Sequence, residues 1–248
     1  MNAPQPELTD FLGILARKFQ GSLLVKYLYL WEYVFFALLA ALLVSLTAYL
    51  ATRKTKLIPG RLQSAAELFV EAVQDLVCGV LGPKADKYFP FIATLFIYIL
   101  FMNLLGLIPF FKSATASLST TFALAICVFV YVQYTAIKEL GFLGYLDHLA
   151  GSPRGALAFS LIIPVFMFVL HLISELIRPV SLSMRLRGNI WGDEVLLGIM
   201  AGFGLKGLPL LFFSMLMGVL KAVVQAAVFA LLTTIYFTLV LKHEEEQV

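Results

Sequence analysis

The sequence predicts an all-α polytopic membrane protein, and two observations carry that prediction. Of its 248 residues, 61% are hydrophobic and only 13% are charged, whereas soluble chains average about 45–50% and about 25%. The charges are also unevenly spaced, because four uncharged runs approach or exceed the roughly 20 residues that a spanning helix needs, namely 33–52, 88–111, 113–137 and 222–241. A β-barrel would show segments of about ten residues with alternating polarity, which the sequence lacks. We expect about five membrane-embedded helices plus one amphipathic surface helix, in a single membrane domain over 1–248.

The first span begins near Trp31 and ends at a basic cluster that contains Arg53, Lys54 and Arg61. Basic residues concentrate on the cytoplasmic side of a membrane. We therefore expect residues 1–30 to form an external amino-terminal segment. That segment opens with acidic residues and lacks the basic start of a signal peptide.

The next element, over 62–81, has too many charges for a span. Glu67, Glu71 and Asp75 recur every four residues, opposite apolar positions such as Leu68 and Val73. This spacing is typical of an amphipathic helix at a membrane surface.

Two ordinary spans follow. One covers 88–111, and the next runs from about Ser117 to Lys138 and Glu139, followed by a predicted loop over 141–154. Cys78 and Cys127 lie in apolar or amphipathic stretches, which favours buried, inert thiols over a disulfide or a metal site.

The region 156–241 differs from the earlier spans because charged residues interrupt its apolar stretches. An ionised group at the centre of a membrane costs about 2.5–3.5 kcal/mol on insertion scales. At about 100° per residue, two polar stripes appear, although Pro179 is expected to kink the first helix. The stripes consist of His171, Glu175, Arg178, Arg185 and Asn189 on one helix, and Ser214, Gly218, Lys221, Gln225 and Tyr236 on the other. We expect a long helical hairpin that carries the walls of an ion path.

The strings SLSMRLRGNIWGDE at 181–194 and QAAVFALLTTIY at 225–236 resemble the a subunit of the F-type rotary ATP synthase. The segments PGRLQSAAELFVEAV and FMNLLGLIP occur in the order of that family, so the resemblance covers nearly the whole chain. It implies the stator subunit of a proton channel, with the last two helices tilted against a ring of c subunits. It also implies two aqueous half-channels separated by an essential arginine, which falls on Arg185.

Most of the remaining site residues follow from the same resemblance, whereas Glu175 and His171 follow from their place in the polar stripe. Asn189 and Gln225 match amides that hold the arginine and line the path, and Glu194 matches the acidic residue of the external half-channel. Glu175 and His171 either line the path or form a polar pair facing a partner helix. Asn103 either packs helices or relays protons, and Tyr236 matches an aromatic with a structural role.

One departure from the family concerns the last helix. Gly218 stands where many members have histidine, and Lys221 lies one turn further along the same stripe. We expect Lys221 to take over part of that polar role, pairing with Glu194 or tuning the potential of the half-channel.

Other functional classes predict features that the sequence lacks. A secondary transporter would show broken helices at matching places in two halves, and a self-contained channel would repeat its pore lining around an axis. The enzyme strings HExxH, GxSxG and GxxxxGK[ST] are absent, so we expect no catalytic site, cofactor or metal.

The implied partners are the c ring, the b subunits of the peripheral stalk, the rest of the complex and lipid. The net charge of +3 is small and scattered, which argues against nucleic acid. The resemblance also implies a multi-pass protein of a bacterial inner membrane, with an external amino terminus and a cytoplasmic carboxyl terminus.

Overall fold

The structure is a computed structural model that describes residues 31–53, 60–82, 85–108, 111–149 and 162–245. The predictions for 1–30 and 156–161 lie outside these residues. In chain order, the elements are α3 (Glu32–Thr52), α4 (Arg61–Leu81), α5 (Ala85–Leu105), the short 3-10 helix η2 (Ala114–Ala116), α6 (Leu118–Leu149), α7 (Ile162–Gly202), η3 (Gly204–Gly207) and α8 (Leu208–Glu245).

Five of the described helices are long and apolar enough to cross a membrane. They correspond to α3, α5, the Leu118–Glu139 part of α6, Val165–Met200 in α7 and Leu208–Leu241 in α8. The predicted all-α class is confirmed. The predicted amphipathic helix forms as α4, which buries Val73 and Val77 and leaves Glu67, Glu71 and Asp75 exposed.

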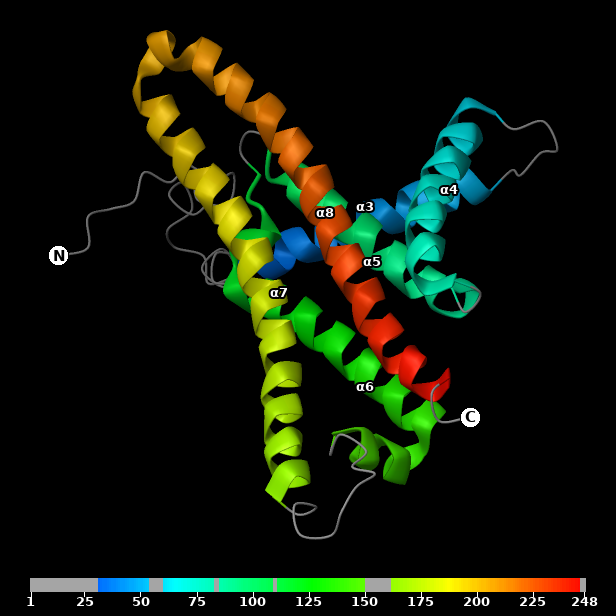
Figure 1. Cartoon of the computed structure of the whole chain (residues 1–248). Coiled ribbons are helices and arrows are strands. Elements are labelled where there is room, and N and C mark those ends of the chain that lie inside the picture. Colours follow the sequence, from blue (N-terminus) through cyan, green and yellow to red (C-terminus); the bar gives the residue numbers. More distant parts are fainter. Residues whose placement is uncertain (1–30, 54–59, 83–84, 109–110, 150–161, 246–248) are drawn as a thin grey trace.

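The core lies where α5, α6 and α8 meet, with α3 packed on α5 and α4 packed on both α5 and α8 (Figure 1). Tyr88 of α5 stacks on Phe237 of α8 with ring centroids 4.9 Å apart, and Phe91 meets Tyr131 of α6 at 4.4 Å. Aromatic pairs at such separations contribute about 0.5–1.5 kcal/mol beyond their burial. The packed helices α3, α4, α5 and α6, here called the support, thus hold the last two helices, α7 and α8, in place.

Helices α7 and α8 form the long hairpin that the sequence predicts (Figure 1). The reversal at η3 depends on glycine, because Gly204 has a φ of +59°, a left-handed conformation that side chains disfavour. A Cβ added at Gly207 would lie 2.5 Å from the carbonyl oxygen of Met200. The two helices can therefore turn within a few residues.

The predicted loop over 141–154 is partly wrong, because α6 extends to Leu149. Gly141 interrupts it with φ 71° and ψ 163°, so the chain changes direction and then resumes helix. Glycine and polar residues suggested a loop here, but one residue with a positive φ makes the turn.

Two smaller expectations also need comment. Helix α7 continues through Pro179 to Gly202, so the proline removes a backbone donor without ending the helix. Both cysteines are free, but Cys127 is exposed and Cys78 half-buried, which corrects the prediction that both are buried.

Candidate functional site

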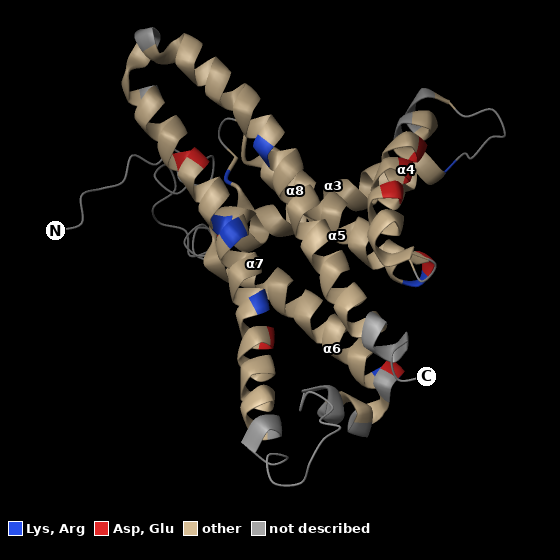
Figure 2. Ribbon diagram, in the orientation of Figure 1, with Lys and Arg blue, Asp and Glu red and all other residues tan. Residues whose placement is uncertain are grey.

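Most charged residues of the spans lie along the hairpin, whereas α5 and α6 are uncharged over most of their length (Figure 2). At mid-length of α7, Arg185 and Asn189 are exposed. Leu182 and Leu186, about 60° and about 100° around the helix from Arg185, are 2% and 0% exposed. Arg185 therefore lies on the open face of the hairpin, near the edge where α7 begins to pack on the other helices.

A hydrogen bond joins the two helices beside this arginine. The amide nitrogen Nδ2 of Asn189 donates to Oε1 of Gln225 on α8 at 2.6 Å. Gln225 is only 4% exposed, so a buried acceptor fixes the turn of α7 that follows Arg185. The structure thus brings together the three residues that the sequence motif linked.

Toward the hairpin turn, Lys221 of α8 pairs with a carboxylate of α7. Its Nζ lies 2.5 Å from Oδ1 of Asp193, one residue before the Glu194 that the sequence suggested as partner. The side chain of Lys221 is 51% exposed and that of Asp193 is 15% exposed. The pair therefore sits at the edge of the open face.

Glu194 lines a small cavity together with Asn103, Ser113, Asp193 and Gly218. The cavity is small, with room for about one water molecule. A Cβ at position 218 would lie 2.5 Å from Cδ2 of Leu107. Glycine at this position therefore leaves room for the tip of Leu107.

Asn103 belongs to a buried polar network that the sequence did not reveal. Thr115 Oγ1 donates to Asn103 Oδ1 at 2.7 Å, and Ser113 Oγ lies 2.7 Å from Thr115 Oγ1. Asn103 Nδ2, which is buried, has no partner among the described residues, although buried donors are normally satisfied.

At the beginning of α3, Glu32 forms a buried ion pair with Lys112, which lies 80 residues later in the sequence. Lys112 Nζ lies 2.7 Å from Glu32 Oε1, with side chains 12% and 8% exposed, and 4.8 Å from the ring centre of Tyr33. Burial by itself lowers the pKa of Lys112, but the hydrogen bonds and charges of Glu32 and Tyr33 outweigh it and raise the pKa above its ordinary value. Tyr33 is also within electrostatic reach of Glu194.

At the other end of α7, Glu175 and His171 each have hydrogen-bonding contacts of their own. Glu175 is 6% exposed and accepts hydrogen bonds from Gln133 Nε2 and from the hydroxyl of Tyr145, the latter at 3.1 Å. The ring nitrogen Nδ1 of His171 lies 3.0 Å from the carbonyl oxygen of Met167. On the helical wheel Glu175 and Arg185 lie about 80° apart, which allows one to face α6 and the other the open face.

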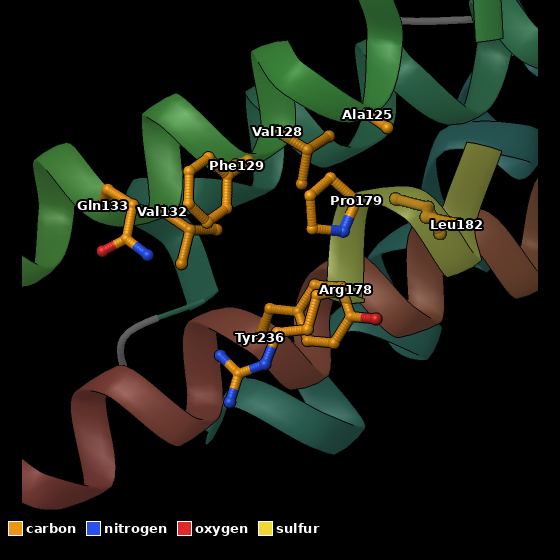
Figure 3. A pocket seen from close by; sticks show the side chains of 9 residues that line it. All are labelled: Ala125, Val128, Phe129, Val132, Gln133, Arg178, Pro179, Leu182 and Tyr236. Atoms are coloured by element: carbon orange, nitrogen blue, oxygen red, sulfur yellow. The ribbon is translucent and has the colours of Figure 1, made fainter. Parts of the chain in front are cut away.

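A second cavity lies between α6, α7 and α8 (Figure 3). Its polar lining comes from Gln133, Arg178 and Tyr236, and the remainder is mainly apolar. The guanidinium carbon of Arg178 lies 5.4 Å from the ring centre of Tyr236, a cation–π distance. The cavity therefore lies beside a contact between Arg178 of α7 and Tyr236 of α8.

Comparisons with known proteins agree with the resemblance. The family described as "ATP synthase A chain" matches residues 34–238. "ATP synthase subunit a" of Protochlamydia amoebophila is 43% identical, over 98% of this chain and 92% of the relative. The "ATP synthase subunit a" of Campylobacter curvus is 40% identical over 88% and 94%. "ATP synthase subunit a 1" of Pelobacter propionicus is 43% identical over 80% and 82%.

The family model matches most of the chain, and these relatives are 40–43% identical to it, which together establish its family. The five apolar helices agree with that family. The chain is an integral, multi-pass membrane protein that belongs to the family of F-type ATP synthase a subunits.

Proposed function

We propose that this chain is the stator wall of the proton channel of an ATP synthase, with two half-channels that Arg185 keeps apart. The observation that carries the proposal is the position of Arg185, exposed at mid-hairpin beside the Asn189–Gln225 hydrogen bond. An intramembrane ionisable residue on an open face calls for a partner of opposite charge. A carboxylate on each subunit of a rotating c ring is that partner.

The chemistry of the guanidinium suits this role. An arginine side chain does not lose its proton in proteins, so Arg185 is a fixed positive charge that carries no protons. A ring carboxylate that comes close to it favours its charged form, with a pKa lowered by about 1–3 units. The carboxylate then releases its proton to one half-channel, and rotation brings it to be reprotonated from the other.

The two half-channels correspond to the two ends of the hairpin. Glu194, with the cavity at Asn103 and the Lys221–Asp193 pair, lines the half-channel toward the hairpin turn. Glu175 and His171 line the half-channel toward the carboxyl terminus. In this arrangement Lys221 supplies a positive charge near the position where Gly218 replaces histidine.

The open face of the hairpin is mainly apolar, as a surface against a c ring in lipid requires. Its exposed apolar side chains on α7 include Val165, Phe166, Val169, Ile173, Leu176, Ile177, Val180, Met184 and Ile199, and on α8 Phe212, Phe213, Leu216, Leu220 and Val224. No other described part of the chain covers these residues. We assign the c ring to this face, and we expect the b subunits and the rest of the complex to bind elsewhere.

The proposal includes an orientation and an energetic role. The amino terminus lies outside and the carboxyl terminus in the cytoplasm of a bacterial inner membrane. Each proton that crosses 100 mV releases about 2.3 kcal/mol, so several protons are needed for each ATP. The subunit has no catalytic site of its own, and ATP chemistry belongs to its partners.

The test is the Arg185→Ala variant in the assembled complex, measured by ATP-driven acidification of vesicles and by passive proton leak. We expect pumping to be lost and the leak to rise. The control is Arg187→Ala on the same helix, since Arg187 Nε donates to the carbonyl of Ala116 at 3.3 Å and does not lie on the open face. Normal coupled pumping by Arg185→Ala would overturn the proposal.

A further inference from the structure

Three polar side chains meet at the beginning of α3. Glu32, which is 6% exposed, accepts a hydrogen bond of 2.7 Å from Nζ of Lys112. The same ammonium group lies 4.8 Å from the ring centre of Tyr33 and also hydrogen-bonds that side chain. A buried charge is costly unless it is paired and hydrogen-bonded, and Lys112 is both. The three residues therefore form one connected cluster.

The segment that carries Lys112 lies beside the cavity at Glu194. Phe111, one residue earlier, packs against Phe36 of α3 with ring centroids 5.8 Å apart. Ser113, one residue later, is 1% exposed and lines the cavity together with Glu194. The 3-10 helix η2 follows and contacts both α3 and α7. The beginning of α3 and the part of α7 around Glu194 are therefore packed on the same segment.

The hydroxyl of Tyr33 links this cluster to α7. It lies within electrostatic reach of Glu194 as well as of Lys112. An ammonium group has donors only, so the phenol oxygen accepts the hydrogen bond from Lys112, and the single proton of the hydroxyl points away from that cation. A phenol keeps this proton at physiological pH. The hydroxyl is therefore a donor whose direction Lys112 fixes.

Within the described part of the chain, Glu194 is the carboxylate that suits this donor. Oε1 of Glu32 already accepts from Lys112, and Oε2 of Glu32 has no hydrogen-bond partner among the described residues, so Glu32 does not take the proton. Asp193 pairs with Lys221. Burial alone would lower the pKa of Lys112, but its partners outweigh burial and raise it. The cation that orients the hydroxyl therefore stays charged.

We propose that Tyr33 is a positioning residue of the half-channel toward the hairpin turn, and that its hydroxyl, oriented by the Glu32–Lys112 pair, donates a hydrogen bond to the Glu194 carboxylate, directly or through one water. The inference rests on the proposed function, in which Glu194 lines that half-channel. A carboxylate held in one orientation presents the same oxygen to each proton that passes. The first span is then part of the ion path as well as of the support.

The decisive experiment removes the hydroxyl and keeps the ring. In Tyr33→Phe, the contact of the ring with Lys112 remains, so we expect normal amounts and normal thermal stability of the assembled subunit. Initial rates of ATP-driven acidification and of gradient-driven ATP synthesis, measured on the whole complex in vesicles, should fall about threefold to tenfold, as expected for one lost hydrogen bond. Wild-type rates would overturn the proposal. The matched control is Tyr98→Phe, because the hydroxyl of Tyr98 also bonds α3, at the carbonyl of Ala37, and Tyr98 does not line the cavity at Glu194. We expect it to pump normally.

A double-mutant cycle tests whether Tyr33 acts through Glu194. Added to Glu194→Gln, Tyr33→Phe should lower the rates by less than about twofold, because two residues that act through one interaction are not additive. A full additional loss would show that Tyr33 acts elsewhere, and the proposal would fail.

A further variant separates orientation of the hydroxyl from stability of the fold. Glu32→Leu/Lys112→Met removes both charges together, which is often neutral for a fold, but it leaves Tyr33 without the donor that orients it. We expect an assembled subunit whose rates fall about as far as those of Tyr33→Phe. Full rates would mean that the ion pair only stabilises the fold, and would overturn the orienting role. If one of these variants does not assemble, the other decides the proposal.

The outcomes also separate this inference from the proposed function. If Arg185→Ala is uncoupled but Tyr33→Phe pumps at the wild-type rate, only the role of Tyr33 is refuted. If Arg185→Ala pumps normally, the proposed function itself fails, whatever the Tyr33 variants do.

Discussion

The buried ion pair between Glu32 and Lys112 gives the sharpest prediction about stability. It joins the first turn of α3 to the connection between α5 and η2, and both side chains are almost fully buried. Removal of one member of a buried pair typically costs about 3–5 kcal/mol, because the other charge stays buried. Replacement of both members by apolar residues of similar volume is often neutral or stabilising.

The structure predicts different losses of stability for the two single variants. In Glu32→Leu, the ammonium group of Lys112 keeps the ring of Tyr33 at 4.8 Å, a contact of about 0.5–2 kcal/mol, so we expect a loss of about 2–4 kcal/mol. In Lys112→Met, Glu32 loses its cation, and its Oε2 already has no hydrogen-bond partner in the described part of the chain. We expect about 4–5 kcal/mol for that variant.

The assay is thermal release of the subunit from the purified complex in detergent, compared among the two single variants and the double variant Glu32→Leu/Lys112→Met. We expect the double variant to be more stable than either single variant. Additive losses would refute the reasoning, because they would show that the two charges do not interact. The control is the pair of Lys87 and Glu139, with side chains 56% and 22% exposed, where a Glu139 variant should change stability far less.

The pH dependence of this stabilisation follows from the raised pKa of Lys112. A group whose pKa is higher in the folded state stabilises the fold fully below its unfolded pKa, about 10.4 for lysine. The contribution is lost only as the pH rises through the folded value. The difference between wild type and Lys112→Met should therefore stay constant between about pH 6 and about pH 9.

Three other predictions concern the hairpin and its support. Gln225→Leu should slow ATP-driven acidification about tenfold, and Asn189→Leu should add little to it, since both remove one hydrogen bond. Lys221→Ala should assemble normally, because its pair with Asp193 is half exposed, but should pump several times more slowly; unchanged pumping would rule out a part for Lys221 in the path. Gly141→Ala should cost about 1–2 kcal/mol of stability from its φ of 71° alone, since an added Cβ meets nothing within 4 Å, and the amount of assembled subunit measures the loss.

The sequence predicted the membrane-spanning helices well, because a helix in lipid must be mainly apolar along its span. A span needs about 20 mainly apolar residues, and the spans of α3, α5 and α6 follow the uncharged runs to within about six residues, whereas α7 and α8 extend well beyond any uncharged run. The amphipathic helix was equally visible from its acidic residues at every fourth position. The break at Gly141 was not, because composition alone does not distinguish a loop from a single turn between two helical segments.

Side-chain partners were harder to predict than helices. The helical wheel placed Glu175 and Arg185 in one polar stripe. The two are about 80° apart within that stripe, so they can face different neighbours. Lys221 and its partner are separated by the hairpin turn, and spacing does not decide between Asp193 and Glu194. Gln133 could have indicated a polar contact inside the membrane, because a lone amide in an otherwise apolar span needs a partner.

The polar groups missed by the sequence share a purpose that explains how the site is held. Each ties the hairpin or its surroundings to the fixed support: Gln133 and Tyr145 hold Glu175 at one end, and the network of Asn103 and Thr115 lies beside Glu194 at the other. Arg185, between these ends, has no hydrogen bond or ion pair with the described part of the chain, and it lies on the open face. In the proposed function, Arg185 has to stay accessible to each passing ring subunit, whereas the groups that line the two half-channels have to stay in place. Hydrogen-bonded ends and an accessible centre agree with that proposal.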